Sequence, residues 1–215
     1  MTITSLKNIH NNEDIYILGG GPSLNYIDIN FFNNKTTIGI NKIHKIIPCS
    51  YVIMKDVKGE LHISDIPKET QMIIAKWSQG RRSEGSNDLY IKSITNRSYF
   101  VYDHVDWWPR TKDIDITMMT PKSNKLVNGM STIISAIPMA AYMGAKNIFI
   151  CGHDLKNIEG KQYIDNYNEY HYPKAELYDG NTYESQKCKF QTLVVCAKLR
   201  KEFGCNIVSI NPRIF

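Results

Sequence analysis

The sequence has no paired cysteine motif, no long apolar run and little net charge, and each shortage excludes a class of protein. Its five cysteines are odd in number and form no Cys-x-x-Cys pair, which excludes a zinc knuckle and a disulfide framework. The longest apolar stretch, residues 133–145, is too short to span a bilayer and contains Ser135 and Pro138. The first residues also lack the apolar core of a secretory signal. We therefore expect a cytoplasmic protein without a transmembrane segment.

The net charge of the chain is small as well. The chain has 26 Lys and Arg against 21 Asp and Glu, a net charge of +5, and no arginine-rich run, so we expect no nucleic-acid partner. The charges are unevenly placed: residues 186–215 carry six basic side chains, whereas residues 157–184 carry six acidic ones. This separation indicates either a solvated basic helix face or a mildly positive rim that attracts a phosphorylated small molecule. The oligomeric state is open, with a homo-oligomer among the alternatives.

The pattern of short apolar runs predicts an α/β fold. These runs are continuously apolar rather than alternating, which is typical of strands that are covered on both faces. Two helical stripes each precede such a run, so the chain reads as repeated β-α-β units. With 215 residues, we predict a single Rossmann-like domain over residues 1–215, with a mainly parallel sheet of about seven strands flanked by helices. The expected strands are residues 14–18, 36–40, 51–54, 71–75, 98–102, 147–151 and 206–210.

The two helical stripes have clear ends. The first contains Met130, Ile133, Ile134, Ile137 and Ala141 and ends at Gly144; the second contains Phe190, Leu193, Val194 and Ala197 and ends at Gly204. Pro138 lies within the first stripe and predicts a kink or a displaced helix start, because proline removes a backbone donor.

Two segments do not fit the alternation of strands and helices. Residues 76–97 and 156–185 are polar, irregular and long for plain connections, and the second holds six of the thirteen tyrosines, Tyr163 among them. Residues 156–185 are either a surface excursion packed by aromatic rings or a lid that closes over a ligand.

A glycine-rich turn, Gly19-Gly20-Gly21-Pro22-Ser23, follows the first expected strand. Glycines let the backbone turn sharply and approach a ligand, and the N–H groups beyond them can hold a phosphate or sugar oxygen. Leu24 occupies the place of the last glycine in the GxGxxG dinucleotide fingerprint, and no Walker lysine follows. The position of the turn favours ligand binding, since open α/β sheets bind ligands at such turns.

Two further groups of polar residues lie at strand ends or helix starts. Asn128, Gly129 and Ser131 open the first expected helix, with Lys125 upstream, and either cap that helix or bind a phosphate. His153 and Asp154 follow the strand at 147–151. For His153 we expect a hydrogen-bonded structural role, and for Asp154 either a cap or a partner of a ribose or metal-bound water.

Asn41 and Asp56 follow two other expected strands, and each is an ordinary turn residue when taken alone.

Taken together, GGGPSL after the first strand, Asn41 after the second and the block NGMSTIISAIPMAAYMGAKNIFICGHDL resemble bacterial sialyltransferases of glycosyltransferase family 42. A very similar arrangement occurs in the MptE-like proteins of the DUF115 group, which include 6-hydroxymethylpterin diphosphokinases. The likeness spans about residues 15–215 and is dense in the first turn and in residues 125–155.

The resemblance implies a Rossmann-like sheet and transfer of a sugar from a CMP-activated donor to a glycan hydroxyl, without a metal. Residues Gly19 to Gly21 would lie against the phosphate and ribose, with Ser23 and Ser131 as further donors, and Asn41, Asn128 and Gly129 would contact the donor. Asp154 would lie near the nucleoside, and Tyr163 would bind the leaving phosphate.

Some family positions differ here. Gly20 stands where the family has Asn, and Lys125 stands in place of an arginine. No histidine lies in residues 181–188, where the family has its general base; Glu184 in that window and His171 nearby are the candidates for that role.

Two alternatives to glycosyl transfer stay open. The first is a diphosphokinase acting on a pterin-like alcohol, which needs Mg²⁺, with Asp56 and Asp154 as its anchors. The second is a nucleotide- or glycan-binding module without a catalytic base.

Overall fold

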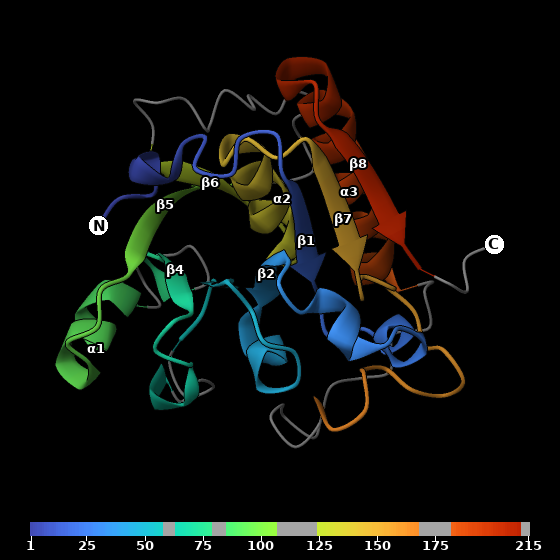
Figure 1. Ribbon diagram of the computed structural model, residues 1–215, viewed down its shortest axis with the longest axis horizontal. Helices are drawn as coiled ribbons and strands as arrows, with labels where there is room; N and C mark the ends of the chain where they lie inside the picture. The colour runs from blue at the N-terminus through green and yellow to red at the C-terminus, as the bar shows by residue number, and fades with distance from the viewer. Residues whose placement is uncertain (58–62, 79–84, 107–123, 168–181, 212–215) are drawn as a thin grey trace.

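The computed structural model describes residues 1–57, 63–78, 85–106, 124–167 and 182–211, and their centre is one eight-stranded sheet (Figure 1). Every neighbouring pair of strands is parallel, which confirms the predicted α/β class with a mainly parallel sheet flanked by helices. The strands are β1 (Asp14–Leu18), β2 (Thr36–Ile40), β3 (Tyr51–Met54), β4 (Gln71–Ala75), β5 (Phe100–Asp106), β6 (Lys125–Asn128), β7 (Asn147–Cys151) and β8 (Asn206–Ile210).

Six of the seven strands predicted from the sequence have the expected bounds. Strand β5 begins at Phe100 and extends to Asp106, beyond the predicted range of 98–102. Strand β6 is the additional one, at a place where the sequence analysis expected only the approach to a helix. It has four residues and an exposed first residue, so its apolar run is too short to signal a strand.

The strand order is β6-β5-β4-β3-β2-β1-β7-β8. New strands are added on one side of β1 as far as β6, and then on its other side. The chain begins at β1 in the middle of the sheet and moves outward strand by strand to β6. It then returns through helix α2 (Ile133–Tyr142) to place β7 on the other side of β1. The boundary between β1 and β7 is therefore a topological switch point, the place where open parallel sheets leave a crevice beyond their carboxyl ends.

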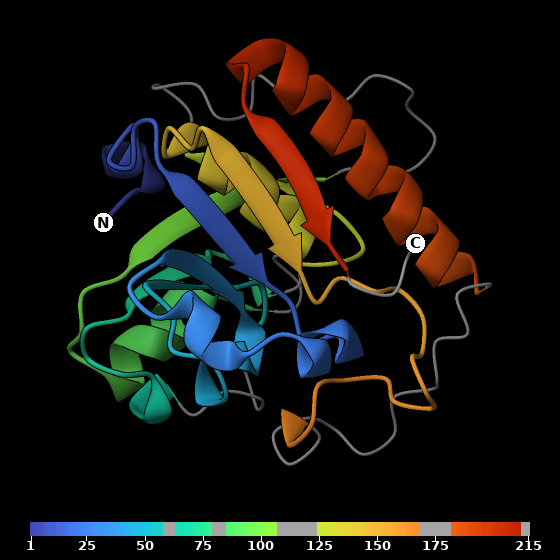
Figure 2. The same ribbon diagram turned by 45° about the vertical axis from the view of Figure 1, so that its right-hand side comes forward.

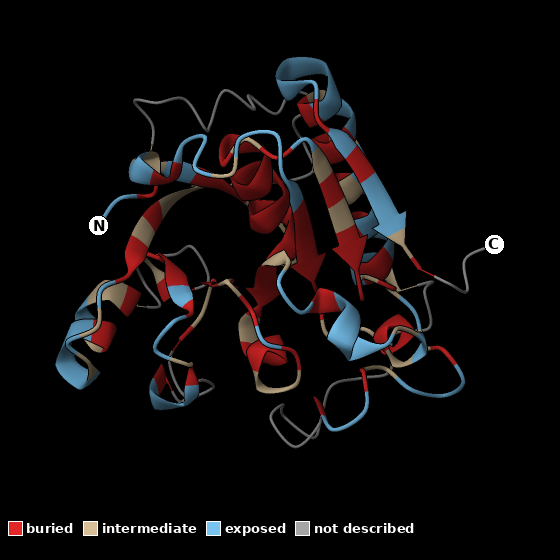
Figure 3. Ribbon diagram, in the orientation of Figure 1, coloured by how far each residue is buried: buried red, intermediate tan, exposed pale blue. Residues whose placement is uncertain are grey.

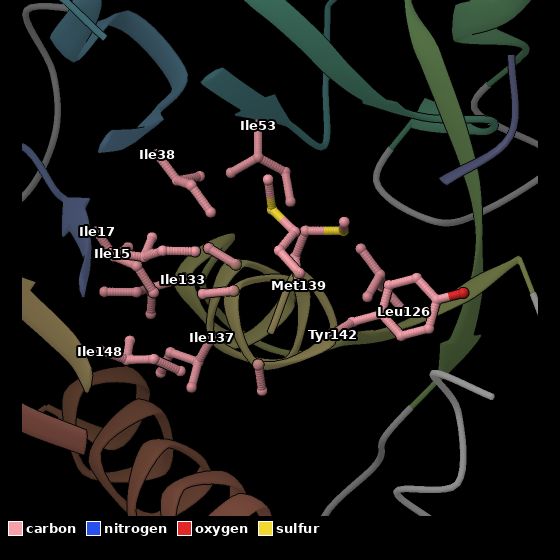
Figure 4. Packing of buried hydrophobic residues seen from close by; sticks show 14 of the residues in the cluster. Ile15, Ile17, Ile38, Ile53, Leu126, Ile133, Ile137, Met139, Tyr142 and Ile148 are labelled. Atoms are coloured by element: carbon pink, nitrogen blue, oxygen red, sulfur yellow. The ribbon is translucent and has the colours of Figure 1, made fainter. Parts of the chain in front are cut away.

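Alternate residues of the central strands enter two separate hydrophobic cores. Ile15 and Ile17 of β1 face the core that contains α2 and α3 (Tyr183–Phe203), whereas Tyr16 and Leu18 face the opposite core. Figure 4 shows side chains of α2 pointing between those of the sheet, and all ten residues of this helix are buried (Figure 3). Burial on every side explains why α2 has no polar face.

The second core is covered mainly by short 3-10 helices. Helix α1 (Asn87–Ile94) belongs to the segment 76–97, which the sequence analysis described as irregular. The hydroxyl of Ser86 caps it by accepting from the N–H of Leu89. The 3-10 helices η2 (Pro22–Tyr26), η3 (Ile29–Phe32), η4 (Asn41–Lys45) and η5 (Ile63–Asp65) contribute to the second core, whereas η1 (Ile3–Leu6) packs on the first core.

Helix α2 begins later than its apolar stripe. It begins at Ile133, three residues beyond Met130, and continues through Pro138 to Tyr142, so the proline does not mark its start. Within the described residues no helix combines the length and the apolar character needed to cross a membrane. All five cysteines are buried and none forms a disulfide.

Helix α3 ends as predicted but buries a partly different face. Gly204 follows it with a left-handed φ of 66°, which confirms the predicted end. The apolar stripe predicted from the sequence is only partly the packed face, because Phe190 is 55% exposed and Leu193 is 60% exposed, while Val194 packs against the first core. Val195 and Leu199 are instead fully buried against the first core. Apolar residues occupy two faces of this helix, so periodicity alone does not decide which face packs.

Two leucines of α3 test this assignment with the same substitution. We expect Leu199→Ala to lower the free energy of unfolding by about 2–5 kcal/mol, because it leaves a cavity in the core. Leu193→Ala, the matched control, should change it by about 0.5 kcal/mol or less. Urea unfolding followed by circular dichroism measures both values; a larger loss at Leu193 would contradict the packing of α3.

Candidate functional site

A cleft of about 440 Å³ lies beyond the carboxyl ends of β1, β2 and β7, at the switch point of the sheet. Figure 2 shows the arrowheads of β1 and β7 pointing toward the edge where η2 and the segment after β7 lie. Residues from six places in the sequence line this cleft, namely the three strand ends, the segment from Gln162 to Tyr167, the start of α2 and the start of α3. The predicted site residues among them are Gly19, Gly20, Gly21, Asn41, Ser131, Asp154, Tyr163 and Glu184.

The glycine turn allows the ends of β1 and β7 to touch. A Cβ on Gly19 would lie 2.3 Å from the carbonyl oxygen of Gly152, and a Cβ on Gly21 would lie 2.7 Å from the same oxygen. At Gly20 a Cβ would meet the ring of Tyr167 at 2.8 Å. Each glycine is therefore required by close packing against protein atoms, quite apart from any ligand.

Most N–H groups of this turn are already bonded, contrary to the expectation that they are available for a phosphate. Gly19 donates to the carbonyl of Cys151 at 2.8 Å, and Gly21 donates to that of Gly152 at 2.9 Å. The turn continues into the 3-10 helix η2, which is too short to have a substantial dipole. Of the three glycines, Gly20 alone has a backbone N–H with no acceptor among the described residues.

Asp154 holds the turn in place from the end of β7. Its Oδ2 accepts from the backbone N–H of Ser23 at 2.7 Å, and its Oδ1 accepts from the side-chain amide of Asn211. Burial raises the pKa of Asp154, and the N–H of Ser23 opposes that rise. The carboxylate therefore borders the cleft while both of its oxygens bind protein groups. Ser23 is itself fully buried and does not line the cleft.

Left-handed backbone occurs at three residues that line the cleft. Asn41 has a φ of 53°, Gly152 of 68° and Leu155 of 56°. This conformation is natural for glycine and tolerated by asparagine, but it is strained for a residue as bulky as leucine. Strain of this kind collects at ligand sites, where the surrounding fold must hold it in place.

His153 lies in the same cleft with an altered proton affinity. Its Nε2 lies 3.0 Å from the Thr192 hydroxyl of α3 and 4.0 Å from the Cys188 sulfur. Burial lowers the pKa of His153 to about 4, so its imidazole is neutral at pH 7. The sequence analysis expected only a structural histidine here. The signal that could have revealed more is its place at the carboxyl end of a strand beside the switch point.

The first part of the expected lid, residues 156–167, packs on the glycine turn. Ile164 donates its backbone N–H to the carbonyl of Gly20 at 2.9 Å. The rings of Tyr163 and Tyr167 stack with centroids 5.1 Å apart, and Tyr167 is 4% exposed. This part is thus a wall of the cleft.

The remainder of the predicted lid divides into two parts. Residues 168–181, which include His171, lie outside the described residues. Tyr183 to Ser185 form the first turn of α3, so the lid boundary at 185 falls inside a helix. Glu184 is exposed in this first turn and lines the cleft.

Four other predicted residues do not line the cleft. Lys125 is exposed on β6, and Asn128 ends that strand. A Cβ on Gly129 would collide with the side chain of Ile134, so this glycine serves the packing of α2. Asp56 accepts a hydrogen bond from the hydroxyl of Ser78 at 2.5 Å, away from the cleft.

The carboxylates do not form the pair that a magnesium ion would need. Only Asp154 of the two expected anchors lines the cleft, and both its oxygens bind protein N–H groups. No cluster of three or more His, Cys, Asp or Glu side chains suited to a metal occurs among the residues that the structure describes. This donor set does not fit Mg²⁺, which prefers several carboxylate and water oxygens.

Several cleft residues were not predicted as site residues from the sequence. His153 was expected to be structural and Met130 to belong to a helical stripe, and the others come from segments that read as ordinary loops or helix starts. The residues concerned are Met130, His153, Lys156, Gln162, Tyr167, Ser185 and Cys188.

The contact between Gly19 and Gly152 can be tested by substitution. We expect Gly19→Ala to lower the free energy of unfolding by about 3 kcal/mol, because its Cβ would meet a backbone oxygen that cannot rotate away. Gly160→Ala is the control: its φ of 75° adds strain of about 1–2 kcal/mol, but no atom lies within 4 Å of the added Cβ. Chemical unfolding compares them, and an equal or smaller loss at Gly19 would contradict the close approach.

Comparisons with protein-family models, with curated proteins and with solved structures found no match to this chain. The fold and the cleft are therefore established by the chain's own geometry. The likeness to sialyltransferases, which depends on the short motifs quoted above, stays a prediction.

Proposed function

We propose that this protein binds a nucleotide-activated sugar in the switch-point cleft and transfers the sugar to a hydroxyl group. In this proposal the donor is a CMP-sugar, as the resemblance to bacterial sialyltransferases implies, and the acceptor is a glycan. The observation that carries the proposal is the position of the cleft beyond β1, β2 and β7, where parallel α/β sheets bind nucleotides. A volume of about 440 Å³ is within the usual range for small-molecule sites.

The start of α2 offers donors to a phosphate. Ser131 lines the cleft, and the backbone N–H groups of Ser131 and Thr132 have no acceptor among the described residues. The positive end of the helix dipole favours an anion at this place. Lys156 also lines this cleft and brings an ammonium group to it. The helix start and this lysine both favour an anionic group such as a phosphate.

The stacked tyrosines of the cleft suit a sugar or base ring. Tyr163 stacks on Tyr167, and Tyr167 in turn packs against Gly20, so the two rings form a supported pair beside the glycine turn. Tyrosine faces bind sugar and base rings, while the hydroxyl supplies a donor to a departing phosphate oxygen. In the proposed reaction the Tyr163 hydroxyl takes that role, and Asn41 hydrogen-bonds the donor.

The two alternatives receive less support. Diphosphoryl transfer needs Mg²⁺, and Asp56 and Asp154 do not converge on the cleft. A module without a base would lack a proton acceptor in the cleft, whereas Glu184 and a neutral histidine both line it. Transfer without a metal is accordingly the proposed chemistry.

A panel of nucleotides tests the proposal. Thermal unfolding should be measured with CMP, CDP, CMP-sialic acid, UDP-sugars and ATP, each with Mg²⁺ and with EDTA. We expect the cytidine nucleotides to raise the melting temperature to the same extent in both conditions, because ligand binding to the folded state stabilises it. Ser131→Ala should weaken this stabilisation, while Ser64→Ala, outside the cleft, should leave it unchanged.

Two results would contradict the proposal. One is stabilisation by ATP that requires Mg²⁺, which would favour the diphosphokinase. The other is the absence of any shift with every cytidine nucleotide.

A further inference from the structure

We propose that His153 is the general base of the reaction, with its Nδ1 as the atom that takes the proton from the attacking hydroxyl. This inference rests on the proposed function, because it assigns the proton acceptor for glycosyl transfer. It replaces the candidates drawn from the sequence, His171 and Glu184, with a residue whose position and tautomer follow from its contacts. Those contacts join the end of β7 to the second and third turns of α3.

The hydrogen bond at Nε2 fixes the tautomer of His153. The hydroxyl of Thr192 donates its hydrogen to the backbone carbonyl of Cys188 at 2.9 Å. That hydroxyl therefore meets His153, at 3.0 Å, with an oxygen lone pair, so Nε2 must carry the hydrogen of that contact. A neutral imidazole has one hydrogen, which leaves Nδ1 unprotonated. The tautomer is thus set by a chain of two hydrogen bonds that ends on the helix backbone.

The unprotonated nitrogen is open to the cleft. His153 lines the cleft and is only partly buried. Its Nδ1 makes no hydrogen bond with the described residues and is not fully enclosed by protein atoms. Nδ1 is therefore accessible, with a lone pair available to a hydroxyl of a bound ligand.

Other groups around the cleft are less suited to this role. Asp154 uses both oxygens on Ser23 and Asn211. Burial raises the pKa of the Cys188 thiol to about 11, so its thiolate is scarce at pH 7. Glu184 is exposed in the first turn of α3, where water screens its carboxylate. Lys156 carries a proton already and lacks a lone pair at neutral pH.

The binding of a negatively charged donor beside His153 explains how a weak base becomes effective. In the free protein, burial keeps the imidazole neutral and ready to accept. A bound donor brings the negative phosphate into the same cleft, which stabilises the imidazolium as it forms. The titratable groups that share the cleft with it are Asp154, Lys156, Tyr163, Tyr167, Glu184 and Cys188.

The reaction balances without a further reactant. The acceptor hydroxyl gives its proton to Nδ1, and its oxygen forms a bond to the anomeric carbon. The bond from that carbon to the phosphate oxygen breaks, and its electron pair stays with the phosphate. His153 returns the proton to water after the products leave.

Nitrogen-15 NMR of histidine-labelled wild-type protein tests the tautomer without any need for turnover. The spectrum of His153→Gln identifies the signals of His153. We expect Nε2 protonated and Nδ1 unprotonated, with no change between pH 8 and pH 6, and we expect CMP to shift the Nδ1 signal. A hydrogen on Nδ1, or titration at the ordinary histidine pKa near 6.5, would overturn the inference.

Kinetics of transfer from CMP-sialic acid test the role in the reaction. His153→Gln keeps an amide N–H toward Thr192 but offers no basic nitrogen, so we expect kcat to fall at least about 100-fold while the affinity for CMP changes little. Thr192→Val should lower kcat, because Nε2 then loses the acceptor that keeps the hydrogen on it. Thr192→Ser keeps the hydroxyl and should retain the wild-type kcat. His10→Gln, at the amino-terminal edge of the sheet beside Tyr51, serves as the control with unchanged kcat.

The outcomes separate the two proposals. If wild-type protein transfers the sugar and His153→Gln retains its kcat, the base assignment fails and the proposed function stands. If His153→Gln loses CMP affinity to the same extent as kcat, His153 binds the donor and is not the base. If wild-type protein neither binds nor turns over any CMP-sugar, the proposed function fails, and the base assignment fails with it.

Discussion

The contact between the backbones of Gly19 and Gly152 is the constraint on which the rest of the site depends. It joins the ends of β1 and β7, the two strands between which the sheet changes its direction of growth. A side chain on Gly19 would push these ends apart, and the hydrogen bonds from Gly19 and Gly21 to the end of β7 would be lost. With the ends held together, Asp154 can reach the N–H of Ser23 and His153 is carried into the cleft.

Because of this contact, the glycine turn has a different structural role from that of a phosphate loop. In a phosphate loop, glycines leave backbone N–H groups free for the ligand. Here two of those groups bond to the neighbouring strand end, and the surface of Gly20 supports the ring of Tyr167. The turn therefore shapes the cleft, while the start of α2, the residues after β7 and the start of α3 supply polar groups that line it.

The sequence predicted the sheet better than the site. Strands such as Ile15–Leu18 are continuously apolar because both faces are buried, and this signal is local and strong. The buried face of α3 was assigned only in part, because Phe190 and Leu193 are apolar yet exposed. Which face of a helix packs depends on the position of the sheet, and periodicity does not contain that information.

The site itself could be predicted at its strand ends, where Asn41 and Asp154 follow apolar runs. The strand-end position of His153 was visible as well, but the role proposed for it could not be predicted, since that role depends on Thr192 and Cys188, some 35 to 39 residues away on α3. No spacing rule connects them. The same is true of Tyr167, whose importance comes from its contact with Gly20 across the switch point.

A crystal structure of the protein with CMP is the most direct test of the central claim, that the switch-point cleft binds a nucleotide phosphate. The account predicts CMP in this cleft, with its phosphate at the start of α2 near Ser131 and its ring system against Tyr163. CMP bound at another surface, or a cleft that stays without nucleotide at saturating concentration, would contradict it.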